Sequence, residues 1–484
     1  MFDSDQPKEE CGVLGISLPS GDAASSAFFG LHALQHRGQE AAGIAVSDGR
    51  AVRLHKGQGL VSSVFSPEKL APLVGSMAIG HTRYSTTGGN NERNVQPFVV
   101  ETMYGPLGVT HNGNVTNADR LREGLLERGA GLMSSSDTEV ISLMLAAAKG
   151  ETWEERLANM MSSLEGAFCL ALLAGTKVVA TRDPWGFRPL SVGKFPTGGH
   201  AVASETGALR TLGCENIREI QPGEVIVMQG ALMKSFQAVK PKTKQARCTF
   251  EHIYFSRPDA VWDGKSVHAV RQRLGEELAR EHPVEADVVI PVPDSSMPAA
   301  IGYAAVSGIT YNEGFVKNRY IGRTFIEPTD DLRRQGVALK FMTLEENLYG
   351  KRVVMVDDSI VRGTTSGPLV RLVREAGATE VHVRITCPPI AHPCFFGVDM
   401  GSYDQLIAHQ LGVPEIAAHI GADSLGFISV DRMMTAIGPS VMPLPGGVEA
   451  EGHGYCNACF TGQYPVPVQL SLADNKQRFD GVLG

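Results

Sequence analysis

Two adjacent carboxylates, Asp357 and Asp358, follow an apolar segment at residues 353–356. They precede a short loop that contains Arg362, Gly363, Thr364 and Thr365. Backbone N–H groups at the start of the next predicted helix, which runs toward Glu375, can hold a phosphate, and the acids can face ribose hydroxyls. A buried strand followed by an ordinary polar turn is the alternative. The complete ordered string favours a sugar-phosphate site at the carboxyl end of a parallel strand.

A second candidate for chemistry is Cys11, which opens an apolar segment directly behind the polar residues 1–10. Removal of these ten residues as a leader would place the α-amino group of Cys11 beside its own thiol. A free α-amine has a pKa of about 7.7–8.0 and a free thiol about 8.5, so the amine can serve as general base for thiol attack. A buried small residue is the plainer interpretation of one cysteine taken alone.

Four further sequence segments favour a catalytic role for Cys11 over the plainer interpretation. They lie at residues 36–40, 80–86, 111–114 and 134–139. In order and spacing they resemble the glutaminase domain of the N-terminal-nucleophile amidotransferases, over about residues 11–228. The resemblance implies a four-layer αββα fold of the α+β class. It also implies that Cys11 attacks the glutamine amide, that Asn112 and Gly113 stabilise the oxyanion, and that Arg83 and Asp137 bind the α-carboxylate and α-ammonium groups. A surface ion pair for Arg83 and a helix N-cap for Asp137 are the alternatives.

The second half contains polar strings at residues 247–259, 291–296 and 314–326. Together with Cys11 and the acid pair, they resemble the glutamine phosphoribosyl pyrophosphate (PRPP) amidotransferases over nearly the entire chain. The resemblance implies that ammonia released from glutamine is channelled to PRPP. The products would be 5-phosphoribosylamine, glutamate and pyrophosphate, in the first committed step of purine synthesis.

The same resemblance implies an Mg²⁺ ion that neutralises the pyrophosphate and is bound by few protein groups. The metal site would comprise Ser295, Asp357 and Asp358. The PRPP site would comprise Asp357, Asp358, Arg362, Gly363, Thr364, Thr365 and Lys317. A basic stretch that could close over pyrophosphate contains Lys317, Arg319, Arg323, Arg333 and Arg334. A solvated positive loop is the alternative for this stretch.

Eight cysteines occur, and in a chain of this size free, catalytic or metal-bound thiols are expected rather than disulfides. Cys169, Cys214 and Cys387 are predicted to be core residues. Zinc, an iron–sulfur cluster and a redox C-x-x-C pair are the alternatives for the remaining four. One branch of the resembled family loses a leader and carries a [4Fe–4S] cluster. By that resemblance the cluster ligands are Cys248, Cys394, Cys456 and Cys459.

These residues require two kinds of scaffold. Short strands with a few helices are predicted before residue 240, including a helix capped by Asp22 and another that begins near Asp137. A basic segment at 239–247 is expected to be a linker, and beyond it strands alternate with helices, which predicts an α/β phosphoribosyltransferase domain with a parallel sheet. The expected divisions are a leader at 1–10, domains at 11–240 and 241–470, and a tail at 471–484.

The net charge of −8 argues against a general nucleic-acid binder. No apolar run is long enough for a membrane span and no secretory signal is evident, which predicts a cytoplasmic protein. The resemblance also implies a homotetramer inhibited by purine nucleotides. A nucleotide-sensing regulator without catalysis and an amidotransferase that acts on another acceptor are the competing functions. The first would lack the glutaminase half, and the second would not need residues 357–365.

Overall fold

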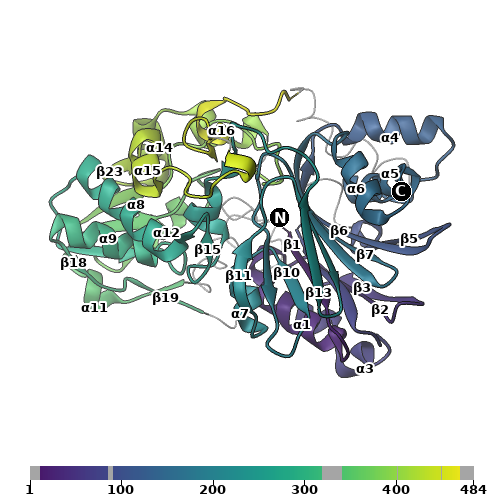
Figure 1. Ribbon diagram of the computed structural model, residues 1–484. Coiled ribbons are helices and arrows are strands. Elements are labelled where there is room, and N and C mark those ends of the chain that lie inside the picture. The colour runs from purple at the N-terminus through teal and green to yellow at the C-terminus, as the bar shows by residue number, and fades with distance from the viewer. Residues whose placement is uncertain (1–10, 85–90, 319–340, 401, 448–449, 469–484) are drawn as a thin grey trace.

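The structure is a computed structural model that describes residues 11–84, 91–318, 341–400, 402–447 and 450–468 (Figure 1). The N-terminal half contains two stacked antiparallel sheets, and the C-terminal half contains a parallel sheet with helices around it. None of the helices in the described ranges has the length and apolarity needed to span a bilayer.

The first sheet of the N-terminal half has the strand order β11-β9-β10-β1-β4-β2-β3. Its strands are β1 (Gly12–Ser17), β2 (Ala41–Ser47), β3 (Val52–Gln58), β4 (Met77–Arg83), β9 (Ser191–Lys194), β10 (His200–Ala203) and β11 (Glu215–Glu219). The second sheet has the order β13-β12-β8-β7-β6-β5. Its strands are β5 (Phe98–Thr102), β6 (Gly105–Val115), β7 (Gly166–Ala174), β8 (Lys177–Arg182), β12 (Glu224–Gln229) and β13 (Leu232–Gln237).

Successive side chains of a strand point to opposite faces of its sheet. Each of these two sheets can therefore pack against the other sheet on one face and against helices on the other face, which gives four layers. In β1, Val13 belongs to the core between the two sheets, whereas Leu14 and Ile16 pack with helix α1 (Ala23–Ala33). On the far side, α5 (Asp137–Ala147) and α6 (Trp153–Met161) cover the second sheet through a separate apolar core. The predicted αββα fold is therefore confirmed. The predicted cap of α1 is also confirmed, since Asp22 accepts a hydrogen bond from the Ser25 N–H.

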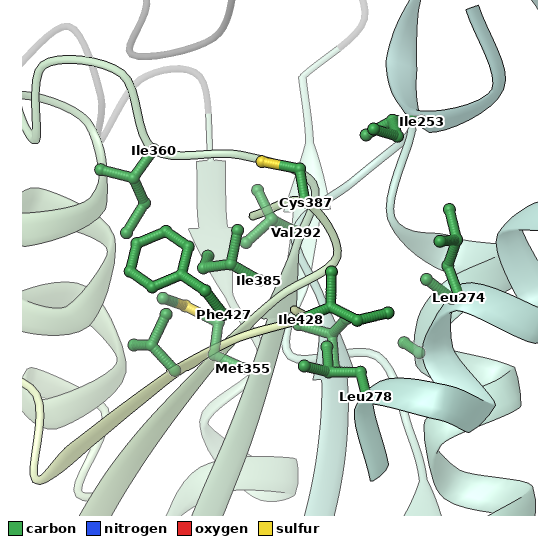
Figure 2. Close-up of a cluster of buried hydrophobic side chains, with 14 of the residues drawn as sticks. Ile253, Leu274, Leu278, Val292, Met355, Ile360, Ile385, Cys387, Phe427 and Ile428 are labelled. Atoms are coloured by element: carbon green, nitrogen blue, oxygen red, sulfur yellow. The ribbon is translucent and has the colours of Figure 1, made fainter. Parts of the chain in front are cut away.

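The C-terminal half is built on a parallel sheet with the order β18-β17-β21-β22-β23. Its strands are β17 (Val288–Pro291), β18 (Thr310–Tyr311), β21 (Arg352–Asp357), β22 (Glu380–Ile385) and β23 (Ser424–Phe427). The longer helices around it are α8 (Val267–Glu281), α9 (Met297–Ser307), α12 (Ser366–Glu375), α14 (Val413–Ile420) and α15 (Val430–Ile437). Figure 2 shows Leu278 of α8 beside Ile428, and it shows Met355, Ile385 and Phe427 grouped together, all within one cluster of buried hydrophobic side chains. This confirms the predicted parallel α/β fold.

Short elements connect the two halves. A parallel pair of two-residue strands, β14 (Arg247–Cys248) and β24 (Tyr455–Cys456), lies where they meet, next to the π-helix η3 (Glu251–Phe255). The segment 239–247, predicted to be a linker, differs from that expectation at its end. Gln245, Ala246 and Arg247 are buried, because the Ala246 N–H donates to the Trp185 carbonyl and Arg247 enters β14.

Candidate active sites

The predicted nucleophile Cys11 directly precedes β1, between strands β4 and β10 of the first sheet. Its side chain is buried, and its thiol donates to the Tyr84 carbonyl at 3.4 Å. Burial raises the thiol pKa to about 11, against the opposing effect of the Arg83 charge. Since a neutral thiol is a weak nucleophile, attack from this position requires a base. The predicted leader, residues 1–10, lies outside the described residues.

The predicted oxyanion donors Asn112 and Gly113 lie on β6, the strand that pairs with β7. The side-chain amide nitrogen of Asn112 is buried and has no hydrogen-bond partner among the described residues. Buried donors are normally paired, so an unpaired one in a catalytic setting indicates a donor held for a ligand. Gly113 has φ of 136°, and a Cβ there would lie 2.2 Å from the Ala167 carbonyl oxygen, which only glycine avoids.

The predicted glutamine-binding residues Arg83 and Asp137 are buried, and their charges have opposite effects on the Cys11 pKa, which Arg83 lowers and Asp137 raises. Asp137 is the first residue of α5, and Ser136 is the N-cap, with its side chain accepting from the Thr138 N–H. The alternative that Asp137 caps this helix is therefore wrong, since its backbone is already helical.

The Asp137 carboxylate lies in a buried polar environment that sequence reasoning missed. One oxygen lies 3.4 Å from Nδ1 of His111, and the other accepts from the Val115 N–H at 3.2 Å. Burial alone would raise the pKa of Asp137, but His111 lowers it below its usual value. The residue preceding Asn112 therefore helps to keep this carboxylate ionised.

A buried ion network joins the nucleophile to the C-terminal half, and the sequence assigned no role to its members. Arg37 contacts Glu205 at 2.7 Å and Glu251 at 2.7 Å, and its Nε donates to the Cys11 carbonyl at 3.3 Å. Burial alone would lower the pKa of Arg37, but the two carboxylates hold it above its usual value. Burial would raise the pKa of Glu205, but His36 and Arg37 lower it to about 2. Burial would also raise the pKa of Glu251, but Arg37 lowers it below its usual value, so Arg37, Glu205 and Glu251 are all charged at neutral pH.

The acid pair lies at the carboxyl end of β21, as predicted, and both carboxylates are buried. Asp357 accepts from the Ser296 hydroxyl at 3.1 Å, and Asp358 accepts from the Ser295 hydroxyl at 2.5 Å. The structure thus brings Ser295 together with both acids and adds Ser296, which sequence reasoning missed although it adjoins Ser295. Oxygen ligands of this kind suit Mg²⁺, which binds through one or two carboxylates plus substrate phosphates.

The loop after the acids connects β21 to α12, with Thr365 as the N-cap residue of the helix. Gly363 has φ of 73°, a left-handed conformation that favours glycine. The Arg362 guanidinium donates to the Gln405 side chain at 2.7 Å. Lys317 on β19 (Phe315–Lys317) pairs with Asp294 at 2.6 Å. The predicted basic residues Arg319, Arg323, Arg333 and Arg334 lie outside the described residues.

All eight cysteines are free thiols, as expected. Cys169, Cys214 and Cys387 are buried, which confirms their predicted place in the core. The other four predicted cysteines line one cavity together with apolar side chains such as Phe250 and Phe396. They are Cys248, Cys394, Cys456 and Cys459.

The thiols in this cavity affect one another. Burial raises the Cys248 pKa to about 11 against the opposing effect of the Arg188 charge, and the nearby Cys394 thiol contributes to this rise. Burial also raises the Cys459 pKa well above its usual value, with Cys394 and Cys456 adding to the effect. In the described ranges no three His, Cys, Asp or Glu side chains lie close enough to hold a single ion.

Comparison with known proteins agrees with this geometry. A family model described as a glutamine amidotransferase domain matches residues 81–211. The chain is 45% identical to an amidophosphoribosyltransferase of Synechocystis sp. over 484 residues, 99% of this chain and 95% of the relative. A solved structure of the allosteric regulatory enzyme of purine biosynthesis aligns with TM-score 0.88 and 46% identity, over 95% of this chain and 97% of that one.

A second solved structure, glutamine PRPP amidotransferase from B. subtilis complexed with ADP and GMP, aligns with TM-score 0.87 and 45% identity. The alignment covers 95% of this chain and 98% of that one. These alignments cover nearly the full length of the chain and so include both halves. They exclude the two competing functions, a regulator without a glutaminase half and an amidotransferase without the acid pair. The chain belongs to the amidophosphoribosyltransferase family.

Proposed function

We propose that Cys11 releases ammonia from glutamine and that the site at Asp357 and Asp358 transfers it to PRPP. The family's reaction yields 5-phosphoribosylamine, glutamate and pyrophosphate, at the first committed step of purine synthesis. The observation that carries the residue assignment is the unpaired, buried amide of Asn112, because it supplies an oxyanion donor on a strand that contacts β1.

In the first step the thiol of Cys11 attacks the side-chain amide carbon of glutamine. The thiol is protonated at neutral pH, so a base must accept its proton. The α-amine exposed by loss of residues 1–10, with a pKa of about 7.7–8.0, is that base. The Asn112 amide and Gly113 N–H donate to the oxyanion, while Arg83 and Asp137 hold the α-carboxylate and α-ammonium groups. Ammonia then leaves, and water hydrolyses the thioester to glutamate.

In the second step ammonia attacks C1 of the ribose and pyrophosphate departs. Asp357 and Asp358 accept hydrogen bonds from the ribose hydroxyls, and Ser296 and Ser295 fix their orientation. The N–H groups of residues 362–365 hold the 5′-phosphate. Mg²⁺, when bound near Ser295 and the two acids, neutralises charge on the leaving pyrophosphate. Lys317 adds a positive charge toward the same group.

The direct test of the first step replaces Cys11 by alanine. We expect glutamine-dependent formation of pyrophosphate to be lost, while turnover with ammonium salts continues within about threefold of the unsubstituted protein. Turnover that continues with glutamine in this variant would show that another residue is the nucleophile.

We further assign a [4Fe–4S] cluster to the cavity lined by Cys248, Cys394, Cys456 and Cys459, and with it the leader-processed branch of the family. The support is the donor set, four thiols that line one cavity together with apolar side chains. When bound, the cluster supplies a structural link rather than redox chemistry, because neither half-reaction transfers electrons. Its cysteines come from β14, β24, α16 (Ala458–Thr461) and the loop at Cys394.

Protein purified without oxygen should contain about four iron and four sulfide per chain, with broad visible absorption. Cys456→Ser should lose both, whereas Cys214→Ser, a buried cysteine outside the cavity, should keep both. One zinc per chain without visible absorption would refute the assignment.

Purine nucleotides are the expected inhibitors, and the B. subtilis structure complexed with ADP and GMP supports this proposal. We also propose a homotetramer in the cytoplasm, with domains at 11–240 and 241–470. Sedimentation with and without ADP and GMP tests the subunit number, and a monomer under both conditions would contradict it.

A further inference from the structure

A loop of the C-terminal half lies directly against the strand that carries the oxyanion donors. The Asn114 side chain on β6 donates from Nδ2 to the Phe395 carbonyl at 2.9 Å. A Cβ added to Gly397 would lie 2.9 Å from the Gly113 carbonyl carbon and 3.0 Å from its Cα. Residues 395–397 therefore touch the backbone of Gly113 from the other half of the molecule.

The loop is itself held firmly. The buried Arg188 guanidinium donates to the Phe396 carbonyl from Nε at 2.9 Å and from Nη2 at 2.5 Å. The Phe396 ring stacks on Phe187, with 4.3 Å between the ring centroids. The loop therefore presents a fixed surface to Gly113 rather than a solvated turn.

Gly113 is enclosed on two sides. A Cβ at Gly113 would lie 2.2 Å from the Ala167 carbonyl oxygen, and the backbone of Gly397 occupies another side. Because both neighbours are backbone atoms, a shift of the loop must move Gly113 or open a gap beside it. The position of the Gly113 N–H is thus coupled to the position of the loop.

We propose that residues 395–397 position the Gly113 N–H for the oxyanion of glutamine hydrolysis, which makes Gly397 and Asn114 positioning residues. This inference rests on the proposed role of Asn112 and Gly113. An oxyanion donor must lie about 2.7–3.1 Å from the developing charge, and a misplacement of about 1 Å can cost about 100-fold in rate. Arg83 and Asp137, the proposed glutamine-binding residues, lie on β4 and α5 rather than on this loop, so KM for glutamine should change less than kcat.

The test variants are Gly397→Ala, which inserts a methyl group against Gly113, and Asn114→Ala, which removes the hydrogen bond to the loop. We expect Gly397→Ala to lower glutamine-dependent kcat by about 10- to 100-fold, with KM for glutamine within about twofold. Asn114→Ala should lower it by about three- to tenfold. Both should keep ammonia-dependent turnover within about twofold.

A second readout separates positioning from general damage. Alkylation of Cys11 by iodoacetamide forms no oxyanion, so its rate should change less than about twofold in both variants. The matched control is Asn159→Ala, which removes an amide-to-carbonyl hydrogen bond of the same 2.9 Å length, to Lys149, on an exposed surface. It should leave every readout unchanged.

Full glutamine-dependent kcat in both variants would overturn the proposal, and so would parallel losses of ammonia-dependent turnover and alkylation. If Gly397→Ala fails to fold, Asn114→Ala decides alone. Glutamine-dependent turnover in a Cys11→Ala variant would instead overturn the proposed nucleophile, which is a separate result.

Discussion

Replacing Glu205 by glutamine should destabilise the folded chain by about 3 kcal/mol at pH 7. Glu205 is buried, lies 2.7 Å from Arg37 and 2.7 Å from His36, and helps to neutralise the network beneath Cys11. At about 1.4 kcal/mol per pKa unit, a pKa lowered from 4.5 to about 2 stabilises the ionised, folded form by about 3 kcal/mol. Measurements on other buried pairs give about 3–5 kcal/mol when one partner is removed.

The pH dependence has a defined sign. Because the folded-state pKa of Glu205 lies below the unfolded value, its contribution is complete above pH 4.5 and is lost as the pH falls toward 2. At pH 3.5 about 1.4 kcal/mol should be lost from the unsubstituted protein and not from Glu205→Gln. The difference in stability between the two proteins should therefore be smaller at pH 3.5 than at pH 7.

Urea unfolding followed by circular dichroism at pH 7 and pH 3.5 measures these differences. The matched control is Glu165→Gln, which breaks an exposed pair with Arg120 at 2.9 Å and should cost less than about 0.5 kcal/mol. A difference below about 1 kcal/mol for Glu205→Gln at pH 7, or one that is equally large at both pH values, would refute the reasoning.

Three further predictions concern the sites. In the chain that retains residues 1–10, burial keeps the Cys11 thiol protonated below about pH 11. The rate of its alkylation should therefore rise about tenfold per pH unit between pH 7 and 9. An alkylation rate that stops rising within that range would contradict this prediction. Asp358→Asn should lower ammonia-dependent turnover by about 100-fold while hydrolysis of glutamine continues. Equal loss of both activities would contradict the proposal that the two reactions occur at separate sites. If the proposed cluster joins the four thiols, anaerobic removal of iron by a chelator should lower the unfolding temperature of the protein, measured by calorimetry; an unchanged temperature would contradict a structural cluster.

The elements that carry the sites could be predicted because their signals are local. The apolar segment at residues 353–356 lies within β21 (Arg352–Asp357), and the helix predicted to begin near Asp137 is α5 (Asp137–Ala147). Buried strands show as short apolar runs, and an acid pair followed by a Gly/Thr loop is contiguous in the chain. The four cysteines were placed together only through the family resemblance, and the cavity they line agrees with it.

The contacts between the halves could not be predicted in the same way. Arg37 and Glu251 are separated by 214 residues, and Asn114 and the Phe395 carbonyl by 281. No periodicity links such positions, and each side chain taken alone resembles an ordinary surface residue. Burial is what gives these side chains their role, and burial of a polar group depends on how the two halves pack.

The pairing of β14 with β24 also constrains the order in which the C-terminal half can fold. The Thr249 hydroxyl donates to the Cys456 carbonyl across 207 residues, and the whole parallel sheet lies within that interval. Closing so long a loop costs entropy that the two-residue strands cannot offset alone, so the sheet must assemble first. During synthesis on the ribosome, a metallocofactor that needs both Cys248 and Cys456 can therefore be inserted only after the chain has emerged through Cys456.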